Sequence, residues 1–178
     1  MPASQFFQVS PNTLQERFVE ILLAPINYTE MLWIATPLIM VLFLTEIYFS
    51  RYKFEELGWN SAYGNVLVLL FVSIDLFRYL YNNDLLETVT VKTALAIAVS
   101  LMAFLLILIN FFHLLPQETA YGMSSKLPIN FIAYLSIIFV YSPIKVDISA
   151  FIASMTLLVI FSIIIMAIRS TIPTVIED

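Results

Sequence analysis

Five apolar runs follow one another along the chain and leave little sequence outside them. A helix needs about 20 apolar residues, each rising about 1.5 Å, to cross the roughly 30 Å hydrocarbon core of a bilayer. All but one of the runs meet this length. The pattern predicts an all-α integral membrane protein, a bundle of five transmembrane helices at about residues 29–50, 61–82, 89–115, 128–142 and 148–169.

The fourth run is the short one, because Pro128 and Pro143 enclose it. About 15 residues give roughly 22 Å of helix, which is less than a full crossing. It is either a short, shielded span from which Lys145 reaches the interface, or a re-entrant helix that returns to its own side and leaves four transmembrane helices. The tight turn after Pro143 makes the fourth and fifth runs a helical hairpin in either case.

The sequence on either side of the bundle is short. Residues 1–28 are expected to form an N-terminal segment with no export signal, and residues 170–178 a short tail. Thr13 and Glu16 have the spacing of a capping box, and Pro25 is expected to end the helix that follows. The helix carries one apolar stripe, which predicts an amphipathic helix in the interfacial plane or docked on a partner helix. The alternative is a plain lead-in helix packed on its own bundle. The stripe comprises Leu14, Phe18, Ile21 and Leu22.

Composition excludes several classes of protein. The chain is 61% hydrophobic and 12% charged, whereas soluble domains are roughly 45–50% apolar and about 25% charged. Only 3 glycines argue against a turn-rich β architecture. A net charge of −5 provides no basic face for nucleic acid and disfavours a polybasic lipid clamp. With no cysteine, disulfides and thiolate chemistry are ruled out.

Catalytic and cofactor signatures are missing from the sequence. His113 is the only histidine, so a histidine ligand set within this chain is impossible. At the end of the third run it is expected to be an interfacial side chain, with a quinone head group as the alternative ligand. No nucleophile elbow, phosphate loop or dinucleotide motif occurs. We expect no metal site, no cofactor and no catalytic residue, which argues against an enzyme.

Charged residues inside an apolar run are functional candidates, because burying charge in lipid is costly. Asp75, Arg78 and Asn82 are spaced i, i+3 and i+7, so they share one face of the second run, and Asp75 can pair with Arg78. The cluster lies near the end of its helix and is expected to tie it to a neighbour. The alternative is an ion or proton path. Glu46, near the end of the first run, is expected to reach Arg51 or a headgroup.

Uncharged polar residues complete the set. Asn65, Ser73, Ser100 and Asn110 are expected to form hydrogen bonds between helices, each worth under about 2 kcal/mol. In a channel, Asn65 and Asn110 would line the pathway with the charged cluster.

Small residues at i, i+4 spacing predict close helix packing on the third and fifth runs. They serve contacts within the chain or between subunits. The pairs are Ala94 with Ala98, Ala96 with Ser100, and Ala150 with Ser154.

The positive-inside rule does not orient five crossings, because the basic residues divide evenly. Close spacing of Arg51 and Lys53 next to a membrane end favours a cytoplasmic loop between the first two runs. One side holds Arg17, Arg78, Lys92 and Lys145, and the other Arg51, Lys53, Lys126 and Arg169.

Three functions remain open, and we place each in the cell membrane. The first is a non-catalytic subunit or scaffold that associates laterally with itself or with a larger membrane complex. Its partners would be the lipid bilayer and other transmembrane helices, in a homo- or hetero-oligomer, and not nucleic acid. The second is a small oligomeric channel or transporter. The third is a quinone- or lipid-handling subunit of a membrane enzyme.

Overall fold

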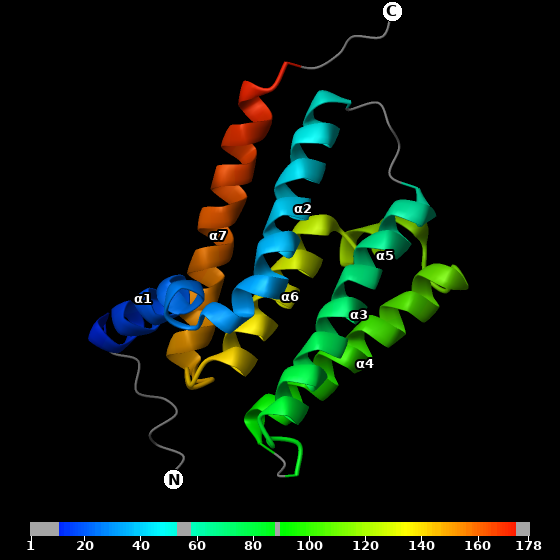
Figure 1. Ribbon diagram of the computed structural model, residues 1–178. Coiled ribbons are helices and arrows are strands. Elements are labelled where there is room, and N and C mark those ends of the chain that lie inside the picture. Colours follow the sequence, from blue (N-terminus) through cyan, green and yellow to red (C-terminus); the bar gives the residue numbers. More distant parts are fainter. Residues whose placement is uncertain (1–10, 53–57, 88–89, 174–178) are drawn as a thin grey trace, which may run out of the picture.

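The computed structural model describes residues 11–52, 58–87 and 90–173, and this part of the chain is helical, without strands (Figure 1). Lys53 and Val89, used in the expectations above, lie outside the described residues, as does the tail from residue 174. In chain order the elements are α1 (Pro11–Asn27), the 3₁₀ turn η2 (Thr29–Met31), α2 (Leu32–Arg51), α3 (Trp59–Asn82), α4 (Val91–Phe111), α5 (Gln117–Met123), α6 (Lys126–Tyr141) and α7 (Ile148–Thr171).

Five helical segments of the described chain are long and apolar enough to cross a membrane, as the sequence predicts. The prediction was wrong for the end of α4, which stops at Phe111 rather than near residue 115. There the N–H of Leu114 donates to the carbonyl of Ile109 at 3.0 Å, and His113 adopts a φ of 53°. This is the Schellman arrangement that ends many helices.

The end of α3 has the same arrangement. Asp84 has a φ of 55°, and the N–H of Leu85 donates to the carbonyl of Leu80 at 2.9 Å. Glycine usually takes this left-handed position, but aspartate and histidine tolerate it better than most other residues. Both connections can therefore be tight in a chain with only 3 glycines.

Helix α6 runs through the middle of the bundle, between the α2–α7 pair and the α3–α4 pair (Figure 1). In the most apolar stretch of the segment Gln117–Tyr141, which ends with α6, 56% of the residues are buried, against 22% in α7 and in the segment that contains α2. Ser124, just before α6, accepts a hydrogen bond from Asn65 near the start of α3, and Tyr141 at the end of α6 stacks on Tyr79 near the end of α3. The short fourth run thus follows α3 lengthwise and does not turn back. With α5 it forms the segment Gln117–Tyr141, surrounded by other helices.

The tightest packing joins α3, α4 and α6. Leu69 and Leu76 of α3 and Ile137 of α6 are fully buried. Ala96 and Ala103 are buried on α4, where their small side chains allow the helices to approach closely. A compact group of three helices therefore supports the more exposed α2 and α7.

Helix α1 packs on α7, at the end of the bundle where α2 and α7 begin (Figure 1). Two expectations about it were wrong. It begins at Pro11, so Thr13 lies inside the helix instead of capping it, and it passes Pro25 to end at Asn27. Proline lacks one donor, but the N–H of Tyr28 still donates to the carbonyl of Ala24 at 2.8 Å, so the turn containing Pro25 is kept.

Candidate functional site

A cavity of about 760 Å³ opens at the end of the bundle where α4 and α7 begin. Helix α1, the α3–α4 connection, the first turn of α4 and the α6–α7 turn at 142–147 form its walls. Its volume is in the range of small-molecule sites. Apolar lining comes mainly from Leu85, Leu95, Phe139, Ile144 and Val146, and charged lining from Glu16, Arg17, Lys92, Lys145 and Asp147.

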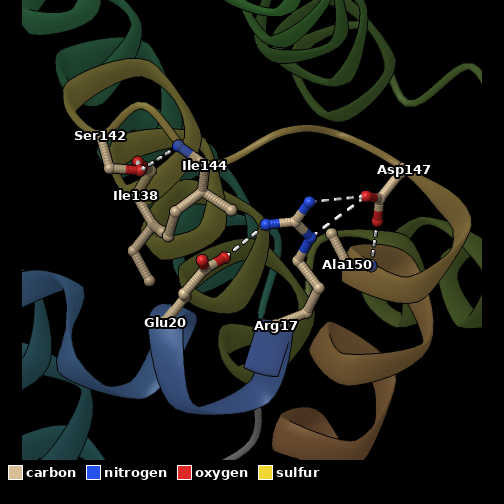
Figure 2. A network of polar contacts seen from close by, with 7 residues as sticks. All are labelled: Arg17, Glu20, Ile138, Ser142, Ile144, Asp147 and Ala150. Atoms are coloured by element: carbon tan, nitrogen blue, oxygen red, sulfur yellow. Dashed lines mark hydrogen bonds and ion pairs between the residues drawn. The ribbon is translucent and has the colours of Figure 1, made fainter. Parts of the chain in front are cut away.

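Arg17 holds α1 against the start of α7 (Figure 2). Its Nε donates to Oδ2 of Asp147 at 3.1 Å, and another guanidinium nitrogen donates to Glu20, one turn along α1. Oδ1 of Asp147 accepts from the N–H of Ala150 at 2.7 Å. Asp147 therefore caps the start of α7, and the same carboxylate also joins α7 to α1.

The charge on Arg17 is permanent. Burial alone would lower its pKa, but the hydrogen bond to Glu20 and the charge of Asp147 outweigh burial and raise the pKa above its ordinary value. Arginine is not deprotonated in proteins, so the guanidinium acts as a cation toward both carboxylates.

The turn that carries Lys145 is held by its own hydrogen bonds (Figure 2). The hydroxyl of Ser142 donates to the carbonyl of Ile138 at 2.6 Å and accepts from the N–H of Ile144 at 3.4 Å. Both Ser142 and Ile144 are buried. The α4 wall is held in a similar way, because Oγ1 of Thr90 caps that helix and so positions Lys92 in its first turn.

The polar cluster expected on the second run is only partly assembled. Both Nε and Nη2 of Arg78 donate to Oδ1 of Asp75, and the hydroxyl of Tyr141 on α6 donates to Oδ2 of Asp75 at 2.6 Å. Tyr79 adds a stacked ring, with centroids 3.9 Å apart, and a hydrogen bond to the carbonyl of Tyr141. Asn82 is exposed at the helix end and takes no part. The sequence missed Tyr141, whose role depends on how α6 lies against α3.

The expected polar bonds between helices divide into two kinds. Asn65 donates to the carbonyl of Ser124 at 2.9 Å, and Asn110 donates to the hydroxyl of Ser124 at 2.7 Å, so both join the α5–α6 connection. The expectation for Ser73 and Ser100 was wrong. Each bonds to a carbonyl of its own helix, as hydroxyls in helices can do without any partner.

Glu46 pairs with Arg169 of α7, whereas Arg51 or a headgroup was expected. Glu46 is only 2% exposed, and Nε of Arg169 donates to its Oε2 at 2.8 Å. Lys126 lies close by, with Nζ 3.1 Å from the centroid of the Phe49 ring. Glu46 reaches Arg169 because the last turns of α2 and α7 lie side by side in the folded chain (Figure 1). This tertiary arrangement could not be predicted from the sequence.

His113 is exposed and stacks on Trp59, with ring centroids 4.0 Å apart. It lies at the end of α4, whereas the cavity is at the start of that helix, so it does not line the cavity.

The small-residue pairs point in different directions. Ala96, Ala150 and Ser154 are buried and Ser100 is half-buried, but Ala94 and Ala98 are exposed on the outer face of α4.

No family model, curated protein or solved structure matches this chain. Its class is therefore read from its own architecture, a helical bundle with five segments long and apolar enough to cross a membrane. Sequence reasoning missed the cavity because its walls come from three stretches of the chain that are far apart in sequence. The one available signal was the position of Lys92 and Lys145 next to helix starts on the same side of the bundle.

Proposed function

We propose that the chain is a membrane protein in which five helices cross the bilayer and α1 lies at the interface. In this proposal it is a non-catalytic subunit or scaffold that associates laterally with itself or with a larger membrane complex. Large apolar side chains on the outside of the bundle support the placement, such as Trp33 (86% exposed), Phe104 (56%) and Met166 (70%). Lipid or another apolar surface would cover these faces, which are costly to expose to water.

The outer face of α4 carries the proposal of lateral association. Ala94 and Ala98 are exposed there, one turn apart, and Leu101 and Leu105 continue the same face. Because the other two small-residue pairs face their own bundle, Ala94 and Ala98 are the pair left exposed among the described residues. Small side chains on a helix face allow a second helix to approach closely in lipid.

Single cysteine variants test this directly, because the natural sequence contains no cysteine. In native membranes, Ala98→Cys should give a disulfide-linked dimer on oxidation where a second copy is the partner, and a cross-link through a thiol–amine reagent where another subunit is the partner. Val159→Cys, on the exposed face of α7, is the matched control and should not. A monodisperse monomer in mild detergent, with no co-purifying protein and no Ala98→Cys cross-link, contradicts the proposal.

The placement in the bilayer has its own test. Alkaline carbonate should leave the protein in the membrane pellet, whereas release into the supernatant contradicts a structure with five crossings.

The channel hypothesis gains no support from the arrangement of its expected residues. Asp75 pairs with Arg78 and accepts a hydrogen bond from Tyr141, whereas Asn65 and Asn110 meet at Ser124 near the other end of α3. None of them lines the cavity. The contacts join neighbouring helices, as a scaffold requires.

A further inference from the structure

The cavity beside α1 has an unbalanced charge. Lys92 and Lys145 line it from α4 and from the α6–α7 turn, and neither forms an ion pair or a side-chain hydrogen bond with a described residue. Arg17 is engaged by Asp147 and Glu20. The residues that line the cavity carry three positive and two negative charges, a formal excess of one positive charge, and Glu20, which also pairs with Arg17, lies outside this lining.

The uncharged walls extend the cavity into the apolar part of the bundle. Leu95 lies one turn beyond Lys92 on α4, and Phe139 lies on α6, before the turn that carries Lys145. A ligand that fits both features has an anionic head and an apolar tail. A free inorganic anion would use the lysines and leave the apolar walls without a partner.

We propose that the cavity binds an anionic phospholipid, with its phosphate near Lys92 and Lys145 and an acyl chain along Leu95 and Phe139. The inference rests on the proposed membrane placement, in which this end of the bundle lies at headgroup depth. A net charge of −5 for the chain does not oppose it, because the relevant charge is the local one.

The Arg17–Asp147 pair gives the site its fixed shape. Asp147 is two residues from Lys145, and its carboxylate is held by both Arg17 and the N–H of Ala150 (Figure 2). Lys145 is therefore presented from an anchored turn, and less conformational entropy is lost when it contacts a phosphate.

Native mass spectrometry of the full chain in detergent tests the proposal. The probes are phosphatidylglycerol and phosphatidylcholine with identical acyl chains, and inorganic phosphate. The wild-type protein should retain phosphatidylglycerol in preference to phosphatidylcholine. Since a lysine near an anionic lipid contributes about 1 kcal/mol, Lys92→Gln/Lys145→Gln should weaken phosphatidylglycerol binding roughly 10- to 30-fold.

Two further variants separate the causes. Arg51→Gln/Lys53→Gln removes the same amount of charge, and because Arg51 is the last residue of α2 and does not line the cavity, this variant should bind lipid like the wild type. Leu95→Trp fills the apolar wall without changing charge and should weaken phosphatidylglycerol binding while leaving any phosphate binding unchanged. Circular dichroism and size exclusion confirm that each variant is folded.

Three results would overturn the site. They are equal retention of the two lipids by the wild type, wild-type affinity in the double lysine variant, and phosphate binding as tight as lipid binding with no effect of Leu95→Trp. Carbonate extraction distinguishes these failures from failure of the membrane placement, because a protein that remains in the pellet can still lack the lipid preference.

Discussion

Glu46 is the most deeply buried charged side chain of the described residues, and its partner Arg169 comes from a helix 123 positions away in sequence. Arg169→Met keeps an apolar stem of similar length but removes both hydrogen-bond donors to Oε2 of Glu46. The carboxylate would then remain buried between α2 and α7 without its cation. We expect this change to loosen the contact between the ends of α2 and α7.

The magnitude follows from the exposure of the two partners. Removing one partner of a fully buried ion pair costs about 3–5 kcal/mol. Arg169 is 56% exposed, so solvent screens the pair and we expect a loss of about 2–3 kcal/mol. Glu46→Gln removes the buried charge itself and should cost only about 1 kcal/mol, the usual net value of a hydrogen bond. The double variant should resemble Glu46→Gln alone, because no uncompensated charge stays behind.

Unfolding by SDS titration in mild detergent, followed by far-ultraviolet circular dichroism, measures these differences. Arg51→Met is the matched control, because Arg51 is an exposed cation at the end of α2 without a carboxylate partner in the described chain, and it should change stability by no more than about 0.5 kcal/mol. The reasoning is refuted if Arg169→Met is no more destabilising than Arg51→Met, or if the double variant loses the sum of the two single losses.

Three further changes test the other contacts. Tyr141→Phe removes the hydroxyl that donates to Asp75 at 2.6 Å and should cost about 1–2 kcal/mol in the same titration, whereas unchanged stability would show that the contact is dispensable. Asp84→Gly relieves a φ of 55° and should stabilise the protein by about 1 kcal/mol, while Asp84→Val should destabilise it; no difference between the two variants contradicts the strain. Asp147→Ala removes both the cap of α7 and the partner of Arg17, so hydrogen exchange in α1 should accelerate, and Asp147→Asn should have a smaller effect. Equal protection of α1 in the wild type and both variants would show that the Arg17–Asp147 pair does not hold α1 in place.

The sequence predicts helix positions well because length and apolar content determine them. It does not predict which helix is central. The segments α6 and α7 are both apolar on all sides, yet more than half of the apolar stretch ending in α6 is buried, compared with 22% for α7. Lipid and protein interior are similarly apolar, so composition cannot distinguish a helix that faces lipid from one that faces other helices.

Polar contacts within one helix can likewise be predicted from the sequence, whereas polar contacts between helices cannot. The Asp75–Arg78 pair follows from a spacing of one helical turn and is present. The Arg17–Asp147 pair joins residues 130 positions apart and depends on how α1 lies against the α6–α7 turn. Sequence spacing carries no information on such a pair. The cavity next to the Arg17–Asp147 pair cannot be predicted from the sequence for the same reason.

The helix with the most buried residues and the helix with the most ion pairs to its neighbours are different helices. Helix α7 has one of the least buried apolar stretches, but it is tied at its start by Asp147 to α1 and near its end by Arg169 to α2. Helix α6 lies at the centre and forms no ion pair in the described chain. In lipid no hydrophobic effect drives helices together, so a helix with little packing needs directional contacts to fix its neighbours. Substitutions that remove a charge should therefore destabilise the protein mainly when they affect the ion pairs of α7. Substitutions that reduce side-chain volume should destabilise it mainly when they lie in α6.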